Sequence, residues 1–296
     1  MSAPPHLFTF TGNLLAERTL EFATWSAGKT QRAASESFQV GGKGINVSKM
    51  LNRLRVANTA LCFTGGAAGA ECETWLRARG FFFHAFASDR PTRAGVVVRA
   101  AGQPETTFLG PDIAPSREAV ARCAQFLDAQ PDGQLLAICG SIPGWDDAAF
   151  DPLRAAFDRW LRRGHLVADT YGRPLQWLAA RPLALVKINA TEFRTLGIDG
   201  DAFPAALEAV RRTLPVRAWI VTDGPGPIWF ADTDHAPAKL EPPRIREVSA
   251  TGSGDVLFAC VLHQRFVLQA SLRASLLAAL PAAAANAAHP GIAEFP

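Results

Sequence analysis

Short apolar runs alternate along the chain with longer amphipathic stretches. Each apolar run ends at a polar or glycine position, as buried strands do. The runs lie around residue 62 and directly before Gly140, Asp169, Lys187 and Thr222. Between them, segments 116–129, 147–163 and 202–213 have helical periodicity. Because strands that alternate with helices pair in parallel, the pattern predicts an α/β fold with helices on both faces of its sheet.

Two segments depart from this alternation. Residues 15–40 contain no convincing helix between Thr19 and Val40. Residues 93–109 have the pattern of a β-hairpin that turns near Ala101-Gly102-Gln103. We therefore expect these two segments to form a small separate sheet.

Polar residues follow several predicted strands directly. Gly140-Ser141, Asp169-Thr170, Asn189 and Thr222-Asp223 all occupy such positions. Ligands of open α/β sheets bind beyond the carboxyl ends of the strands. The sequence therefore predicts a binding site at this edge of the sheet.

The glycine-rich segment 41–46, Gly-Gly-Lys-Gly-Ile-Asn, precedes a helix with an apolar face. Glycines at this place let the backbone approach a ligand, and a helix N-terminus favours anions. Lys43 and Asn46 would add a positive charge and a hydrogen-bond donor. A plain glycine-rich turn is the alternative, and the spacing excludes a Walker A loop.

A second glycine-rich segment, Thr251-Gly252-Ser253-Gly254-Asp255, precedes an almost wholly apolar helix. Asp255 could simply cap that helix. The flanking glycines, however, favour a concave set of N–H donors, and an anion hole beside a carboxylate suits phosphoryl transfer. We expect the helix N-terminus to keep Asp255 ionised and therefore a weak base. A Rossmann fingerprint is the competing interpretation, but its third glycine is missing.

Together, these segments resemble the ribokinase-like (PfkB) carbohydrate kinases, and most closely their 1-phosphofructokinase and tagatose-6-phosphate kinase branch. The resemblance covers nearly the whole chain in order. It is carried by Thr9–Asn13 with Glu17–Leu20, Gly41–Val47, Thr92-Arg93, Gly140–Pro143, Lys187–Glu192, Thr222–Gly224 and Gly252–Asp255.

The resemblance implies a Rossmann-like, doubly wound, mostly parallel sheet with a small β-sheet lid. The core would comprise residues 1–14, 41–92 and 110–296, and the lid residues 15–40 and 93–109.

The resemblance also implies MgATP as phosphoryl donor. The implied catalytic residues are Asp255 as base, with Gly252, Ser253 and Gly254 as anion hole. The implied sugar-binding residues are Glu17, Gly42, Lys43 and Asn46, with Arg32, Arg93 and Ser141 towards the sugar's phosphate. The implied nucleotide and Mg²⁺ residues are Thr222, Gly224, Asn286, Asn189 and Glu192, with Asn189 and Glu192 acting through water and Ala283 beside adenine.

Several positions depart from the branch's pattern. Glu17 stands where the branch has a sugar-binding Asp, and its extra methylene moves the carboxylate forward. Leu14, Ser249-Ala250, Pro227 and Ile188 are further departures. The catalytic segments are intact whereas the sugar-contact segments differ, so the sequence predicts the reaction type better than the sugar. Taken alone, Arg32 and Arg93 could equally be solvated surface charges.

Composition excludes several other classes. The 296 residues are 48% hydrophobic and carry a formal net charge of +3 without a basic block, so we expect a folded protein with no nucleic-acid partner. The five cysteines have no CxxC spacing and are expected to be reduced and buried. The Ala-rich stretch 276–288 is interrupted by Pro281 and is too short to cross a bilayer. With no signal-peptide pattern at the N-terminus, we expect a cytoplasmic protein without membrane contact.

Three functions stay open at this level. The first is a hexose-phosphate kinase acting on fructose 1-phosphate, tagatose 6-phosphate or a close analogue, favoured by Arg32, Lys43 and Arg93. The second is a kinase of the same fold that acts on an uncharged sugar or nucleoside. The third is a non-catalytic sugar- or nucleotide-binding protein, suggested by Glu17 and Pro227. A homodimer is compatible with each of them.

Overall fold

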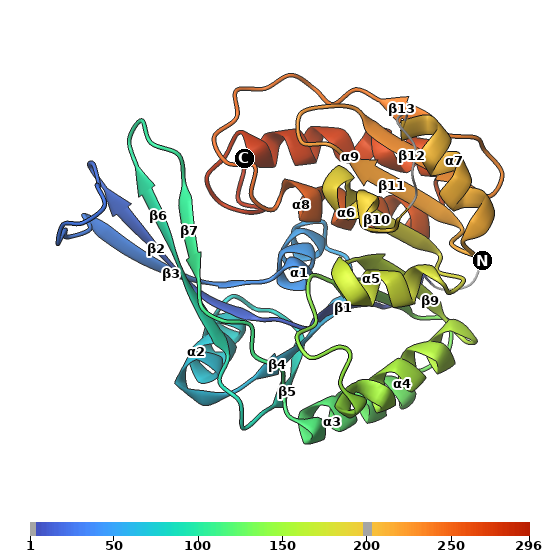
Figure 1. The fold of residues 1–296 in the computed structure, drawn as a ribbon, viewed down its shortest axis with the longest axis horizontal. Helices are drawn as coiled ribbons and strands as arrows, with labels where there is room; N and C mark the ends of the chain where they lie inside the picture. The colour runs from blue at the N-terminus through green and yellow to red at the C-terminus, as the bar shows by residue number, and fades with distance from the viewer. Residues whose placement is uncertain (1–3, 198–202) are drawn as a thin grey trace.

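The structure is a computed structural model that describes residues 4–197 and 203–296. Within them, a nine-stranded sheet forms the centre of the molecule (Figure 1). All neighbouring strands pair in parallel except at one edge, where β12 is antiparallel to both of its neighbours, β11 and β13. In spatial order the strands are β13 (Ala238–Leu240), β12 (Ile228–Asp232), β11 (Ala218–Thr222), β10 (Leu185–Asn189), β9 (His165–Asp169), β8 (Leu135–Cys139), β1 (Leu7–Thr11), β4 (Asn58–Thr64) and β5 (Phe83–Ala87).

The strand order reverses at β1. From β1 the chain adds β4 and β5 on one side, and it later adds β8 to β13 on the other. Thr11, the last residue of β1, is level with Cys62 of β4 and with Cys139 of β8. Helices that cross over in opposite directions leave a crevice at such a point, so the topology places a binding cleft beyond β1 and β8.

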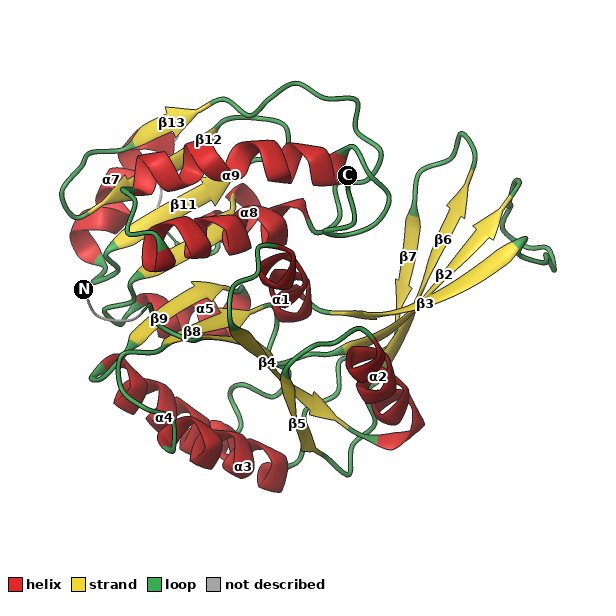
Figure 2. Cartoon of the chain, turned by 180° about the vertical axis from the view of Figure 1, so that it is seen from behind, coloured by secondary structure: helices red, strands yellow, loops and turns green. Residues whose placement is uncertain are grey.

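Helices cover both faces because the strand residues alternate between two cores. Leu136 and Ile138 of β8 pack in one core, whereas Leu135 and Ala137 pack in the other. The first face is covered by α3 (Arg117–Asp128), α4 (Asp151–Leu161), α5 (Gly172–Ala179), α6 (Ala190–Arg194) and α7 (Phe203–Thr213). The opposite face is covered by α1 (Lys43–Arg53), α2 (Gly66–Ala78), α8 (Ser253–Leu262) and α9 (Leu272–Ala287) (Figure 2).

A smaller four-stranded sheet projects from one side of this core (Figures 1 and 2). Its order is β3 (Ser35–Gly41), β2 (Leu15–Phe22), β6 (Arg93–Ala100) and β7 (Thr106–Leu109). Its strands come from the two segments that lacked strand–helix alternation, and β3 extends one residue further, to Gly41, directly before α1. The sequence therefore identified the segments of the second sheet.

The small sheet also contacts the core at a distance from its base. Arg99 on β6 donates from Nη2 to the carbonyl oxygen of Pro290, over 2.9 Å. Thr251 donates from its hydroxyl to Oε1 of Glu105, over 3.2 Å. Arg99 Nε in turn donates to Glu105 Oε2, over 2.6 Å. These contacts link the small sheet to the loop that precedes α8.

The α/β fold with both faces covered is confirmed, and two local predictions are corrected. The predicted helix 147–163 is a short 3₁₀ turn at Ala148–Phe150 followed by α4, because Asp147 caps the turn and Pro152 starts the new helix. The predicted interruption at Pro281 is wrong, since α9 runs through it with Leu276, Ala279 and Leu280 buried on the core. That packing outweighs the lost backbone hydrogen bond.

In the described part of the chain, none of the helices has the length and apolar character needed to cross a membrane. The predicted segments also included residues 1–3 and 198–202, which lie outside the described residues.

Candidate active site

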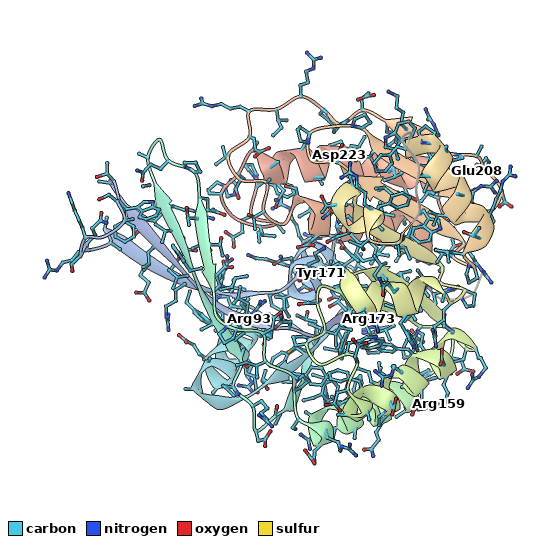
Figure 3. All side chains as sticks on the ribbon, in the orientation of Figure 1. Arg93, Arg159, Tyr171, Arg173, Glu208 and Asp223 are labelled. Carbon is cyan, nitrogen blue, oxygen red and sulfur yellow. The ribbon has the colours of Figure 1, made fainter. Side chains whose placement is uncertain are left out.

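A cleft of about 640 Å³ lies between the small sheet and the carboxyl ends of the central strands. Figure 3 shows Arg93 at the base of the small sheet, Tyr171 before α5 and Asp223 after β11, and all three line this cleft. Arg159 and Glu208, labelled in the same figure, lie on outer helices away from it. The site residues predicted from sequence that line the cleft are Glu17, Gly42, Lys43, Asn46, Arg93, Ser141, Asn189, Thr222, Gly224, Gly252, Gly254 and Asp255.

Asp255 lies in the first turn of α8, and the local sequence forces it towards the cleft. Gly252 has a left-handed backbone with φ +75°, and a Cβ there would lie 2.6 Å from the side chain of Ile292. Only glycine satisfies both conditions without strain. The helix after Asp255 is buried from Val256 to Leu262, which fixes its direction. Asp255 is itself buried, and its Oδ2 accepts a hydrogen bond of 2.7 Å from Asn46 Nδ2.

Burial and the nearby charge of Asp169 raise the pKa of Asp255 to about 6, against the lowering effects of Lys43, Lys187 and Asn46. The sequence led us to expect a weak base, ionised by the helix N-terminus. The expected weakness of the base needs correction, because burial and the charge of Asp169 outweigh the groups that lower the pKa and make the carboxylate a stronger base than an exposed aspartate. Since its pKa is still below neutral pH, most of the carboxyl is ionised at pH 7.

Asp169, at the end of β9, holds two lysines at the centre of the site. Its Oδ1 lies 2.7 Å from Lys43 Nζ, and its Oδ2 lies 2.7 Å from Lys187 Nζ. Burial alone would raise the pKa of this wholly buried carboxyl, but the two ammonium groups outweigh it and leave the pKa lowered. Burial likewise disfavours charged Lys43, yet Asp169, Asp255 and Glu192 raise its pKa.

The position of Lys187 connects this ion network to the first turn of α8. A Cβ built on Gly254 would lie 2.7 Å from Lys187 Nζ. The ammonium group therefore lies close to the backbone of this turn. A side chain at position 254 would displace the lysine from this position, so glycine here allows the close approach.

Asn189 and Glu192 form a capping box at the start of α6. Asn189 Oδ1 accepts from the Glu192 amide over 2.8 Å, and Glu192 Oε2 accepts from the Asn189 amide over 2.9 Å. Glu192 Oε1 lies 3.3 Å from Lys43 Nζ, and Glu192 is not among the residues that line the cleft.

The donors at this place suit Mg²⁺ only through water. Both predicted magnesium residues offer hard oxygen atoms, but each side chain is already engaged in the capping box. Residues 4–197 and 203–296 contain no cluster of three His, Cys, Asp or Glu side chains that could enclose a metal ion. Mg²⁺ keeps several waters and shares substrate phosphates in such sites, so these residues fit outer-sphere contact.

The far end of the cleft contains a polar network around Arg93. Arg93 Nη1 donates to Asp112 Oδ1 over 2.7 Å, and Asn13 Nδ2 donates to the same oxygen over 2.8 Å. Asn13 Nδ2 also donates to Ser141 Oγ over 2.9 Å. Arg93 Nε is buried without a hydrogen-bond partner among the described residues. Arg93, Asn13 and Ser141 line the cleft with hydrogen-bond donors, so this end is suited to a ligand that accepts hydrogen bonds.

Glu17 lies on β2 and faces the cleft beside Gln39, whose Nε2 donates to Glu17 Oε1. Burial raises the pKa of Glu17; the hydrogen bond from Gln39 opposes this, and nearby Glu105 adds to it. The carboxylate thus faces the cleft, is held by Gln39 and is partly desolvated. Such a group is suited to accept hydrogen bonds from the hydroxyls of a ligand.

A second, mostly apolar cavity of about 430 Å³ adjoins the first. The two share Thr222, Gly224 and Gly254. The second cavity is lined further by Leu257, Leu280, Ala283, Ala284, Ala287, Ile228, Pro242 and Ser253, among others. Together they form a continuous groove across the strand ends.

Three predicted residues line neither cavity: Arg32, Asn286 and Glu192, whose side chain is engaged in the capping box. Arg32 is exposed in the loop between β2 and β3 and lines neither of them, so the structure does not bring it to the cleft, and its contact with a sugar's phosphate stays a prediction. Asn286 is wholly buried. Its Nδ2 donates to the Thr251 carbonyl and to Ser253 Oγ, both over 3.1 Å, and its Oδ1 accepts from the Ala293 amide. It supports the loop from behind and lines neither cavity.

Comparison with known proteins agrees with this geometry. Residues 13–295 match the model of the pfkB family carbohydrate kinases. The chain belongs to this family. It is 26% identical to the 1-phosphofructokinase of Bacillus subtilis over 86% of this chain and 83% of that protein.

Solved structures of low identity show the same fold. Phosphofructokinase-2 of Escherichia coli, solved with substrates and products, is 19% identical and aligns with a TM-score of 0.87 over 99% of this chain and 95% of that chain. Arabidopsis thaliana ribokinase, solved with ribose and ATP, is 18% identical and aligns with a TM-score of 0.71 over 100% and 96%. The ribokinase-like fold expected from the sequence is therefore confirmed.

Two residues that line the cleft, Lys187 and Tyr171, and the buried Asp169 beneath it received no role from the sequence pattern. Asp169 was noted only for its place after a strand, and Lys187 only as part of a motif. No sequence pattern pointed to Tyr171. Its side chain lines the cleft because of the course of the loop before α5, which no local pattern predicts. A charged residue inside an apolar strand, such as Lys187, was the one available sign of a buried partner.

The raised pKa of Asp255 predicts a pH-dependent effect on stability. The folded protein binds this proton more tightly than the unfolded chain, so the ionised carboxylate costs folding free energy above pH 6 and costs little below pH 4. We expect Asp255→Asn to raise the melting temperature more at pH 7.5 than at pH 5. Calorimetry of both proteins at the two pH values checks this. An equal shift at both would contradict a raised pKa.

Proposed function

We propose that this carbohydrate kinase transfers the γ-phosphoryl group of MgATP to a hydroxyl of a hexose phosphate, of the fructose 1-phosphate or tagatose 6-phosphate type. The observation that carries the proposal is the position of Asp255. A buried carboxylate with a pKa of about 6 lies beside a glycine-rich helix start, with two lysines within its electrostatic reach. This combination of a base and an anion hole is what phosphoryl transfer to a hydroxyl requires.

In the proposed reaction, Asp255 orients the acceptor hydroxyl and takes its proton. Its Oδ2 accepts from Asn46, which holds the carboxylate in place, and Oδ1 would accept the proton of the acceptor hydroxyl. A base of pKa about 6 is largely ionised at neutral pH and yet accepts a proton more readily than an exposed aspartate. Proton transfer is needed late, because the transition state of phosphoryl transfer is loose.

The charge of the transferring group is met by two sets of donors. The amides of Gly252 and Gly254 at the start of α8 would supply fixed dipoles, and the helix N-terminus adds to them. The Ser253 amide already donates to the Ala250 carbonyl over 3.2 Å. Lys187 supplies a full positive charge against the Gly254 backbone. Both sets are held in place before substrate binds, which is the condition for effective electrostatic stabilisation.

The nucleotide would lie along the groove formed by the two cavities. The apolar cavity beside α9 suits adenine, with Ala283 and its small neighbours leaving the room. Thr222 and Gly224, shared by both cavities, would meet the phosphates or ribose. Mg²⁺, when bound, would neutralise phosphate charge, and Asn189 and Glu192 would hold its water shell.

The acceptor would lie at the other end, under the small sheet. Arg93 and Ser141 would bind its phosphate, and Glu17 would bind a sugar hydroxyl. We propose that the small sheet is a lid that excludes water from this end. The hydrogen bond between Glu105 and Thr251 supports this, because it ties the sheet to the loop of the anion hole.

Phe108 on β7 is an exposed apolar side chain against which a second copy of the chain could pack.

A second candidate function is a kinase of an uncharged acceptor. It is favoured by Asp112, whose carboxylate already pairs with Arg93 over 2.7 Å and reduces the positive charge at that end. The two candidates differ only in the acceptor, so one panel of acceptors separates them.

The direct test is ADP release from MgATP with a panel of acceptors. The panel contains fructose 1-phosphate, fructose 6-phosphate, tagatose 6-phosphate, free hexoses, ribose and adenosine. We expect turnover on a phosphosugar and a loss of about 10³-fold in Asp255→Asn, the range that general base catalysis contributes. ATP affinity should be retained in the variant, because Asp255 does not line the apolar cavity.

Turnover on uncharged acceptors alone would favour the second candidate. ATP binding without turnover on any acceptor would contradict catalysis and support the non-catalytic protein suggested by Glu17 and Pro227.

Arg93 allows the acceptor's charge to be tested by mutation. If it binds the acceptor's phosphate, Arg93→Ala removes a charged hydrogen bond worth about 1.5–3 kcal/mol, so KM for the phosphosugar should rise about 10- to 100-fold with KM for ATP unchanged. Arg159→Ala is a matched control, since Arg159 also pairs with an aspartate, Asp128, but lies on an outer helix. An unchanged KM for the phosphosugar in Arg93→Ala would remove the proposed phosphate contact.

A further inference from the structure

Tyr171, the one tyrosine of the chain, presents an exposed ring in the cleft. The residue is 42% exposed and precedes α5 (Figure 3). The backbone before it is firmly held. Thr170 donates from its hydroxyl to the Gly140 carbonyl over 2.6 Å, and the Gly140 amide donates to the Asp169 carbonyl over 2.8 Å. The ring therefore projects from a fixed base and has no partner that buries it.

The ring stands between two hollows. A smaller hollow of about 340 Å³ adjoins the main cleft, and the two share Ser141 and Tyr171 as lining residues. Ser141 is fixed by the hydrogen bond from Asn13. The wall between the hollows thus consists of a rigid turn and an exposed aromatic side chain, and the side chain is the part that a mutation can remove.

The charges around the smaller hollow limit what could enter it. Asp112, Asp146 and Asp147 line it, against the one guanidinium of Arg173, which pairs with Asp146 over 3.1 Å. Arg93, from the main cleft, pairs with Asp112 over 2.7 Å, so two of the three carboxylates are paired with an arginine and the hollow offers no surplus of positive charge for a second phosphate. Carboxylate oxygens accept hydrogen bonds from hydroxyls, so an uncharged, hydroxyl-rich group suits this hollow.

We propose that Tyr171 determines acceptor size: its ring closes the acceptor end of the cleft, restricts it to a single phosphorylated sugar unit, and keeps larger acceptors out of the acidic hollow beyond. This proposal rests on the function proposed above. The ring contacts no reacting atom, and its effect is steric. It also lies over Lys43, with Nζ 5.7 Å from the ring centroid, so the steric effect has to be separated from an effect on that lysine.

The test compares Tyr171→Ala with Tyr171→Phe, which keeps the ring and loses only the hydroxyl. The acceptors are the hexose phosphate used by the wild type and two disaccharide monophosphates, sucrose 6-phosphate and trehalose 6-phosphate. The readout is the ratio of kcat/KM for each disaccharide phosphate to kcat/KM for the hexose phosphate. We expect at least a tenfold rise of this ratio for one of them in Tyr171→Ala, and no rise in Tyr171→Phe.

Two results would overturn the proposal while leaving the kinase function intact. One is an unchanged ratio in Tyr171→Ala with both disaccharide phosphates. The other is an equal loss of kcat for every acceptor, which would mean that the ring acts through Lys43. Because the side chain is exposed, both variants should melt within a few degrees of the wild type.

If the wild type turns over no acceptor, the proposed function fails and the size restriction is tested by binding. Calorimetric titration of Tyr171→Ala and wild type with the same disaccharide phosphates then decides. Tighter binding of one of them to the variant supports the restriction by Tyr171, and equal binding of both refutes it.

Discussion

The site depends on one buried carboxylate, Asp169, that pairs with two lysines at once. Without oppositely charged partners, a carboxylate that is fully buried would take up a proton or move to the surface. Each lysine in the centre of the fold likewise needs a negative charge close by. The pairing costs desolvation of three charged groups, so its value to stability is small at best. What it fixes is geometry: Lys187 is held against the Gly254 backbone, and Lys43 is held over the cleft. The charges are in position before any phosphate arrives.

The same carboxylate shapes the base. Asp255 and Asp169 are both negative in a region of low polarity, and their repulsion adds to burial in raising the pKa of Asp255. The lysines work in the opposite direction and keep the group ionised at neutral pH. The repulsion by Asp169 is therefore balanced against the attraction of the two lysines. The result is a base that is ionised at neutral pH and still more basic than an exposed aspartate. The loop before α8, supported by Asn286 from behind and joined to the small sheet through Glu105, places this base beside the anion hole.

Much of the fold and part of the site were predictable from the sequence. The β-strands before Gly140, Asp169 and Thr222 were readable because buried parallel strands are short, apolar and end at polar residues. Asp255 was readable because glycines precede a wholly apolar helix. Arg32 could not be placed, because loop direction depends on tertiary packing and no local pattern encodes it. The pKa of Asp255 was misjudged because the helix dipole is a local feature, whereas burial and Asp169 come from distant segments. The buried position of Asn286 was missed for a similar reason: its Nδ2 donates to Thr251 and Ser253, which lie 35 and 33 positions earlier.

The most direct test of this account is the pH dependence of kcat/KM in the wild type and in Asp169→Asn, on the acceptor that the wild type uses. The account predicts two effects in the variant: a fall in kcat of about 10²-fold or more, as the lysines lose their anchor, and a shift of the acid limb to lower pH, because one negative charge near Asp255 is gone. A folded Asp169→Asn protein with unchanged kcat and an unmoved acid limb would contradict the central role of this carboxylate.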